Sequence, residues 1–596
     1  MFGVWGLLPL AIVLLVWAAG AATLLVFHDE KSTPADRAAG FVVLAMAIVH
    51  LSVGGLGELG LLSAGALLAV LGASSALFTA ALPQRGGPVC SPRLTRADVV
   101  ALVPTLTILG LSVVTARITP IWQWDAFGYH LPFVHFVLQS GGFDGVPRDV
   151  PYISTYPHNV ELEMVWLRAM LPDDRLVDLV QVPLGAAGAL LIAAIARRLG
   201  APRAWALLGG AAWLGAPGVF LQLPTNYVDV GAATALLGAV YFALLSEPTR
   251  RNLALGGVAL GLFLGCKPSA PVVVALALAF VTVRALRAKQ HVGLAGLWAG
   301  TLVFGAQVYV DLWLRHGNPV WPVSVKLGPW ALPGERSVEK LLAAAAAVPG
   351  AGAGNALERV TLSWLAVDAS PVFDMRLGGF GGLFLLALPF ALVTLVRARR
   401  AALLAAVALA ALAPDPANTR YVLGLAGLVF ALAAVQARAL RRHEALAPSL
   451  IVVAVIAAQV ARAFPGLTGE GPSWVSLWQM SDAERRIAVG PEGPPRQFAP
   501  LWAELSARDR VAFDGEFELP GLLWSPSLDY SVQFLPRLET AAELQAWLTG
   551  HDVTVVAVGS RHAELLRRLP GGWRKRFDCT SSECAVYLRG DRRAER

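Results

Sequence analysis

Charged residues are scarce in this sequence, and their scarcity excludes an ordinary soluble protein. Only 15% of the 596 residues are charged and 56% are hydrophobic, whereas about 25% are charged in an average soluble domain. Apolar runs extend over residues 4–27, 59–81, 292–314 and 377–396. As helices they are long enough to cross a hydrocarbon core about 30 Å thick, which takes about 20 residues. The chain is therefore predicted to be an all-α polytopic membrane protein.

Other features are missing as well, and each absence narrows the function. The C-terminal 133 residues, 464–596, contain no G-x-S-x-G, no phosphate-binding glycine loop and no metal-ligand spacing. The apolar runs have few charges at their midpoints and no internal repeat is evident, which argues against a transporter. The N-terminus has no basic segment before its apolar run, and that run is longer than a signal peptide needs. We therefore expect a retained first helix.

The basic residues indicate how the chain is oriented. The net charge is +7, but the basic residues lie in short clusters between apolar runs, which favours membrane orientation over nucleic-acid binding. If all clusters are cytoplasmic, the chain has about 14 transmembrane helices with both termini outside. Two short helices around Lys267 are also compatible with one broken or re-entrant element. The clusters are Lys31/Arg37, Arg85/Arg93/Arg96, Arg197/Arg198/Arg203, Arg250/Arg251, Arg284/Arg287/Lys289, Arg397/Arg399/Arg400 and Arg438/Arg441/Arg442.

Three regions follow from this pattern. Residues 1–97 are predicted to form accessory transmembrane helices, and 98–463 a transmembrane core with long outer loops at 117–172 and 315–376. Residues 464–596 are richer in charge and are predicted to form a small soluble extracytoplasmic α/β domain after a Pro/Gly-rich linker, 464–472. Its predicted helices are 500–507, 540–548 and 561–569, and its predicted strands are 510–513, 553–558 and 585–588.

Cys579 and Cys584 lie close together in this C-terminal region. In an oxidising compartment such a pair favours a local disulfide that closes a hairpin, with free thiols as the alternative.

Polar residues gather in the first outer loop, directly after a membrane helix. Asp125 and Tyr129 are four residues apart, so on a helix they share one face, with His130 beside them. An ionisable residue at this boundary is costly unless it is paired or used. The alternative is an interfacial aromatic belt with an incidental carboxylate.

Other polar residues are expected at the same membrane face. Together they supply at least two carboxylates and two cations, which suits an anionic phosphate ligand and a nucleophile that needs deprotonation. Each has a simpler alternative: Asp229 as a helix N-terminal acid, Lys267 as a snorkelling anchor, Arg420 as an orientation residue. The residues are His158, Glu161, Asn226, Asp229, Lys267 and Arg420.

The ordered set of motifs resembles the GT-C superfamily of membrane glycosyltransferases, particularly bacterial members akin to protein O-mannosyltransferases and lipid A aminoarabinose transferases. The resemblance covers roughly residues 98–445. Its motifs are Trp124-Asp125-x-x-x-Tyr129-His130, Tyr156-Pro-His158-Asn-x-Glu161, Asn226-Tyr-Val-Asp229, Gly265-Cys-Lys267-Pro, Gly317-Asn-Pro-Val-Trp-Pro322 and Arg420-Tyr421.

This resemblance implies a hexosyl- or pentosyltransferase that uses a polyprenyl-phosphate-linked sugar donor. It implies Asp125 as the base or acceptor-orienting group, Asp229 as a second acid, and Lys267 and Arg420 as cations for the donor phosphate. Tyr129, His130, His158, Glu161 and Asn226 complete the expected substrate-binding set. The chain departs from the family in two ways: four apolar helices precede the first loop, and the acidic pair at the first motif is Asp125-Ala126 here.

The expected partners are the lipid-linked donor, a lipid, glycan or protein acceptor, and membrane lipids, with no nucleic acid. The expected location is the cytoplasmic membrane, with the active site and the C-terminal domain outside. No cofactor is expected; a divalent metal held by Asp125, His130, His135 and His158 is the alternative. The competing functions are an envelope polysaccharide polymerase or ligase, a transporter or flippase, and a membrane scaffold.

Overall fold

The computed structural model describes most of the chain. The described residues are 6–29, 32–82, 94–148, 150–327, 329–337, 355–367, 378–439, 446–463, 473–489, 494–570, 572–579 and 584–590. Lys31, Arg85, Arg93, Arg441, Arg442 and the predicted linker 464–472 lie outside them.

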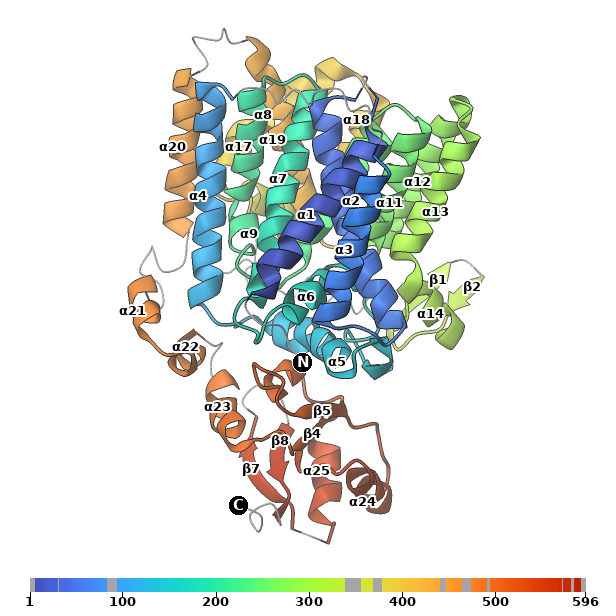
Figure 1. The fold of residues 1–596 in the computed structure, drawn as a ribbon, viewed down its shortest axis with the longest axis vertical. Helices are drawn as coiled ribbons and strands as arrows, with labels where there is room; N and C mark the ends of the chain where they lie inside the picture. The colour runs from blue at the N-terminus through green and yellow to red at the C-terminus, as the bar shows by residue number, and fades with distance from the viewer. Residues whose placement is uncertain are drawn as a thin grey trace.

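Apolar helices form a bundle that makes up most of the molecule (Figure 1). In the described part of the chain, seven helical segments are long and apolar enough to cross a membrane, or eight if the bent pair α13 and α14 counts as one span. The chain is therefore a multi-pass membrane protein, as predicted. The seven segments contain α1 (Leu7–Val26), α2 (Pro34–Glu58), α4 (Arg96–Ile118), α7 (Gln181–Arg198), α12 (Ala270–Arg287), α17 (Gly381–Ala398) and α19 (Leu423–Val435).

Shorter helices complete the bundle, so the number of about 14 spans stays a prediction. They are α3 (Ala64–Ala80), α8 (Arg203–Leu214), α10 (Asp229–Ala239) with its π-helical continuation η4 (Val240–Leu245), α11 (Arg250–Leu264), α18 (Ala401–Ala411) and α20 (Leu446–Ala463). Lys267 lies in a turn between two separate helices, α11 and α12. The broken element is instead α13 (His291–Gly305) followed by α14 (Gln307–His316), which are bent by 68°.

Glycines allow α11 and α13 to pack backbone against backbone. A Cβ on Gly257 would lie 2.2 Å from the carbonyl oxygen of Leu297, and one on Gly261 would lie 2.6 Å from that of Gly300. Close approach at small residues is the usual way for helices to associate in lipid, where burial of apolar surface offers little gain. This contact fixes the end of α11, and therefore the turn that carries Lys267.

At one end of the bundle, arginines pair with aspartates, two of them in the first turn of a helix and one in the connection between α1 and α2. The Arg198 guanidinium donates to Asp36 at 2.8 Å, Arg251 donates to Asp29 at 2.6 Å, and Arg203 pairs with Asp98. We call this the basic end; it is the upper end in Figure 1.

The opposite end, called the site end, carries the segment that was predicted to be the first outer loop. A π-helix η1 (Ala126–His130) runs into α5 (Leu131–Ser140), and α6 (Asn159–Ala169) follows after η2 (Phe143–Gly145). In Figure 1, α5 and α6 lie across the lower end of the bundle, between it and the C-terminal domain. The second outer loop contributes β1 (Val323–Leu327), β2 (Trp330–Leu332), β3 (Arg336–Ser337) and α16 (Ala356–Trp364), with sheet order β2-β1-β3.

The C-terminal region contains a five-stranded sheet of order β5-β4-β6-β8-β7. Strands β5, β4 and β6 are parallel, and β8 is antiparallel to β6 and β7. The elements are α21 (Trp474–Gln479), α22 (Asp482–Val489), α23 (Pro494–Glu504), β4 (Arg510–Phe513), η7 (Pro520–Leu523), β5 (Ser531–Phe534), α24 (Ala541–Gly550), β6 (Val555–Gly559), α25 (Ser560–Arg567), β7 (Arg574–Asp578) and β8 (Cys584–Leu588).

The predicted strand 510–513 is confirmed as β4, and the other predicted elements of this region are present with shifted ends. β5 and β7 were not predicted. β7 has the sequence Arg-Lys-Arg-Phe-Asp and an almost fully exposed pattern, so it lacks the apolar alternation that marks a half-buried strand. The disulfide between Cys579 and Cys584 is formed, with the two Cα atoms 5.3 Å apart.

The C-terminal domain docks onto α5 and α6 through polar contacts. Gln139 donates its side-chain N–H to the Val532 carbonyl at 3.0 Å and accepts the Val532 N–H at 2.9 Å, so it pairs like a strand with edge strand β5. The buried Arg168 guanidinium donates to the carbonyl oxygens of Leu171 and Pro526, each at 2.8 Å. These contacts fix the domain against the segment that carries Asp125.

Candidate active site

A cavity of about 860 Å³ lies at the site end, where the bundle, both outer loops and the C-terminal domain meet. Its walls include seven of the nine residues predicted for the site; His158 and Asn226 are not among them. The seven are Asp125, Tyr129, His130, Glu161, Asp229, Lys267 and Arg420.

Asp125 and Arg420 form the first ion pair on this cavity. Asp125 directly precedes the π-helical turn η1, and both Asp125 and Tyr129 lie on the cavity wall, where the sequence had suggested an α-helix. Arg420 comes from η5 (Thr419–Val422), and its two terminal nitrogens lie 3.3 and 3.2 Å from one Asp125 carboxylate oxygen. The Arg420 guanidinium also lies 5.3 Å from the ring centroid of Tyr227 and 5.1 Å from that of Tyr421.

Asp229 and Lys267 form the second ion pair. Asp229 is the first residue of α10, and the Gln181 side-chain oxygen caps that helix by accepting the N–H groups of Val230 at 2.9 Å and Gly231 at 3.4 Å. The Lys267 ammonium lies 4.6 Å from the ring centroid of Tyr421. Lys267 and Arg420 therefore contact the same aromatic ring.

Asn159 holds the turn that carries Lys267. The Asn159 backbone N–H donates to the Gly265 carbonyl at 2.7 Å. Its side-chain N–H groups donate to the carbonyls of Leu262 at 2.9 Å and Phe304 at 2.7 Å. One side chain thus ties α6 to the ends of α11 and α13, which fixes where Lys267 enters the cavity.

Glu161 and His130 line the cavity and pair with each other. The His130 Nδ1 and Glu161 Oε1 atoms are 2.7 Å apart, and His158 Nδ1 lies 3.8 Å from the same oxygen. Burial raises the pKa of Glu161, but the contacts with His130 and His158 outweigh it and lower that pKa to about 2. Glu161 is therefore a carboxylate at neutral pH, and its pairing joins η1 to α6.

The two predicted residues outside the cavity have other surroundings. His158 stacks on Phe133, with ring centroids 3.7 Å apart. Asn226 is fully buried three residues before Asp229, and its side-chain amide has no hydrogen-bond partner in the described part of the chain.

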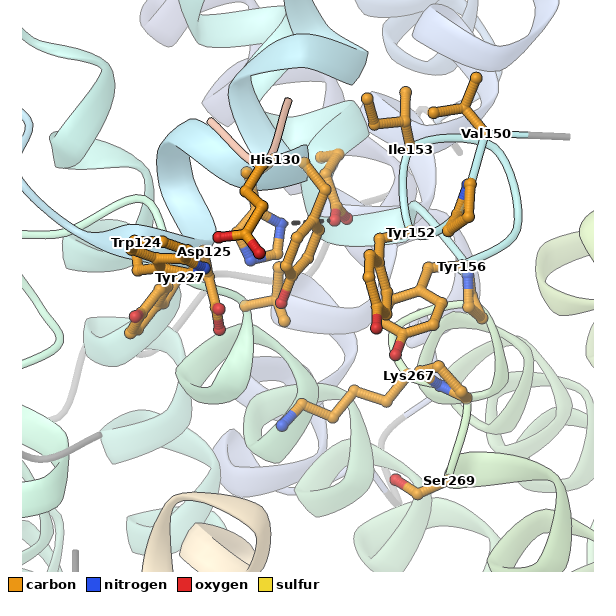
Figure 2. Close-up of a pocket in the computed structure, with 18 of the residues that line it drawn as sticks. Trp124, Asp125, His130, Val150, Tyr152, Ile153, Tyr156, Tyr227, Lys267 and Ser269 are labelled. Atoms are coloured by element: carbon orange, nitrogen blue, oxygen red, sulfur yellow. Dashed lines mark hydrogen bonds and ion pairs between the residues drawn. The ribbon is translucent and has the colours of Figure 1, made fainter. Parts of the chain in front are cut away.

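Tyrosines form one side of the cavity. The ring centroids of Tyr129, Tyr152 and Tyr156 lie 5.0 to 5.7 Å from one another, and Arg336 from β3 donates to the Tyr152 hydroxyl. Figure 2 shows Tyr152 and Tyr156 across the cavity from Trp124 and Asp125. Burial and the nearby Asp125 charge raise the pKa of Tyr129 well above its usual value, so this phenol stays protonated.

The sequence did not identify several wall residues. Arg336 lies 14 residues after the last quoted motif before it, Asp415 lies five residues before Arg420 but was not singled out, and a loop of the C-terminal domain was assigned to a separate unit. That loop contributes Phe513, Asp514, Gly515, Phe517, Glu518 and Pro520. Tyr152 lies four residues before Tyr156 of one quoted motif, and Tyr227 lies inside the motif Asn226-Tyr-Val-Asp229 without having been assigned to the site. An aromatic residue beside a predicted polar site was the available signal.

The histidines of the alternative metal site are dispersed. His135 is buried beside Trp524, with ring centroids 5.3 Å apart, and burial lowers its pKa to about 3. His130 and His158 contact Glu161, whereas Asp125 contacts Arg420. Within the described ranges, no group of three or more His, Cys, Asp or Glu side chains could hold a metal ion.

Comparisons with known proteins return similarity at the level of the fold. No protein-family model matches the chain, and no curated protein matches it. Two solved structures of ArnT from Cupriavidus metallidurans are similar over 82% of this chain and 97% of theirs, at 13% sequence identity. The TM-score is 0.49 for the apo structure and 0.46 for the structure bound to undecaprenyl phosphate.

Proposed function

We propose that this protein is a membrane glycosyltransferase that moves a sugar from a polyprenyl-phosphate donor to an envelope lipid, glycan or protein. Transfer would occur at the outer face of the cytoplasmic membrane. The observation that carries the proposal is the pair of ion pairs, Asp125–Arg420 and Asp229–Lys267, on one cavity at the end of an apolar bundle. The motif order in the sequence supports the same assignment.

The cations suit the phosphate of a lipid-linked donor. Lys267 and Arg420 are only 13% and 10% exposed, so an incoming phosphate would meet them largely shielded from water, where electrostatic attraction is stronger. As the bond to the sugar breaks, negative charge grows on the leaving phosphate, and fixed cations stabilise that charge without reorganisation. The lipid tail would remain in the bilayer beside the bundle.

The carboxylates suit the acceptor. An acceptor hydroxyl oxygen bonds to the anomeric carbon of the sugar, and its proton passes to the Asp125 carboxylate. The bond between the anomeric carbon and the phosphate oxygen breaks, and its electron pair leaves on the polyprenyl phosphate. When the phosphate attracts Arg420, Asp125 loses part of its ion pair and becomes a stronger base.

The proposal includes no cofactor. The donor carries its own leaving group, so transfer requires no nucleotide, and the two cations take the role that a metal has in other phosphate-leaving reactions. Incubation of the purified protein with EDTA should leave transfer unchanged. A loss of transfer that Mn²⁺ or Mg²⁺ restores would replace this part of the proposal with a metal-dependent one.

Mass spectrometry of a strain lacking the gene tests the function. We expect the parent and a complemented strain to carry one envelope sugar that the deletion strain lacks, with the lipid-linked donor accumulating in the deletion strain. Loss of a long polymer instead would favour a polysaccharide polymerase or ligase. A donor confined to the cytoplasmic leaflet would favour a flippase, and unchanged envelope glycans would overturn the proposal.

A further inference from the structure

The C-terminal domain closes the cavity opposite the bundle. Its loop of residues 513–520, which we call the acidic loop, runs from the end of β4 into η7. Glu518 is exposed and lines the cavity, and no hydrogen bond or ion pair engages its carboxylate within the described ranges. Every other charged residue of the cavity named so far has a partner. An unpaired carboxylate on the wall of a cavity is available to a ligand.

The sheet topology points independently to the same loop. Strand β4 lies between β5 and β6, and all three are parallel. The chain leaves β4 toward β5 on one side, and leaves β6 toward β8 and β7 on the other. Open α/β sheets bind ligands outside the carboxyl ends of strands at such a switch point. Here the switch point, at the carboxyl end of β4, faces the cavity.

Buried hydrogen bonds hold the acidic loop in place. The Asp514 carboxylate accepts the Gly559 N–H at 3.0 Å, and one of its oxygens lies 2.7 Å from His562 Nδ1. The His562 Nε2 atom accepts the Leu538 N–H at 3.2 Å. The hydrogen bonds of Asp514 and His562 therefore hold the loop, and Glu518 lies on a fixed backbone.

The loop also abuts the turn that begins at Asp125. A Cβ on Gly521 would lie 2.9 Å from the Phe127 carbonyl oxygen, and one on Gly128 would lie 3.5 Å from that of Glu518. Trp124 precedes Asp125, lines the same cavity and is 43% exposed. Trp124 and Glu518 thus both line the cavity next to the η1 turn.

Charge separates this wall from the one that suits a phosphate. The cavity cations Lys267, Arg336 and Arg420 come from the α11–α12 turn, β3 and η5, whereas the acidic loop brings carboxylates and no cation. A phosphate is repelled from Glu518 and attracted to the opposite wall. The wall formed by the acidic loop therefore suits the other substrate.

We propose that Glu518 and Trp124 form an acceptor subsite for an uncharged saccharide. The Glu518 carboxylate accepts hydrogen bonds from sugar hydroxyls, and the exposed Trp124 ring packs on the apolar face of a sugar ring. Contact between the loop and η1 delivers the reacting hydroxyl to Asp125. This inference rests on the proposed glycosyltransferase function and names its acceptor class; acceptors with phosphate or carboxylate at this position would be rejected.

Glu518→Arg and Glu518→Gln test the subsite, and Glu516→Arg is the matched control, because Glu516 is an exposed carboxylate of the same loop that does not line the cavity. Each variant is expressed in the deletion strain, and transfer is measured as the fraction of modified envelope glycan. We expect transfer to fall about tenfold or more in both Glu518 variants, the loss expected for a hydrogen bond to a charged group, and to be unchanged in Glu516→Arg.

Binding of farnesyl phosphate to the purified protein distinguishes a failure of the acceptor subsite from a failure of the proposed glycosyltransferase function. We expect Glu518→Gln to bind farnesyl phosphate as the native protein does. Unchanged transfer in both Glu518 variants would overturn the acceptor subsite. So would a loss of farnesyl phosphate binding in Glu518→Gln, which would assign the loop to the donor. A native protein that does not bind farnesyl phosphate would instead overturn the proposed function.

Discussion

The two ends of the helix bundle use the same chemistry, carboxylates paired with cations, in different ways. At the basic end, Asp36 accepts the Thr33 N–H at 2.9 Å and its hydroxyl at 2.7 Å, in addition to Tyr241 and Arg198 at 2.8 Å each. Asp98 accepts from Thr95 in the same capping arrangement, and from Arg203. These carboxylates lie in the first turn of a helix and are saturated with donors.

At the site end, neither Asp125 nor Asp229 belongs to such a capping box in the described structure. Each instead pairs with a cation on the wall of the cavity of about 860 Å³. A saturated ion pair stabilises a helix end, whereas a pair that borders an open cavity can exchange its partner for a ligand. The comparison therefore assigns structural work to one end and chemistry to the other, and the predictions below test that division.

The sharpest test of the division is which end faces outward. Cys90 and Cys266 are the two cysteines outside the disulfide, and both are first replaced by Ala. In that background, Gly550→Cys in the C-terminal domain should react with a membrane-impermeant maleimide in intact cells. Ala288 is exposed and directly follows α12 at the basic end, so Ala288→Cys should react only after the membrane is opened. The reverse labelling would show that the cavity lies on the cytoplasmic side of the membrane.

Asp125→Asn should have the largest effect on chemistry. It keeps the shape of the side chain but removes the base, so transfer should fall about 10²-fold or more. Asp36→Asn makes the same change at the basic end and should leave transfer near normal. Thermal unfolding in detergent would show that both proteins fold. Near-normal transfer in Asp125→Asn would defeat the assignment of the base.

Lys267→Met should weaken phosphate binding. It removes a cation but keeps most of the side-chain volume, so farnesyl phosphate should bind about tenfold or more weakly, with a smaller dependence on salt. Arg251→Met removes a cation from an ion pair at the basic end and should bind as the native protein does. Equal affinities in the two variants would show that Lys267 does not bind the donor phosphate.

Asp229→Asn should lower transfer as well, because it leaves Lys267 without its partner.

Hydropathy and charge were enough to predict the bundle, because they depend on local composition, and polar motifs predicted seven of the residues that line the cavity. The exact number of membrane spans could not be predicted in this way, because α8, α10, α11 and α18 are shorter than a full crossing. Sequence patterns also missed Glu518, Arg336 and the closure of the cavity by the C-terminal domain. Those contacts join residues nearly 400 positions apart, such as Gln139 and Val532, and leave no periodic signal.

The smallest effects should come from the helix caps, and they compare the two ends most directly. Thr95→Val removes a capping hydroxyl at the basic end, and should cost about 1 kcal/mol of folding free energy without changing transfer. Gln181→Leu removes the cap of α10 at the site end, and should cost a similar amount. Because α10 begins at Asp229, Gln181→Leu should also lower transfer several-fold. Unfolding temperature and transfer, measured on both variants, would show stability loss alone at the basic end and both losses at the site end. Equal transfer in the two variants would contradict the division of roles.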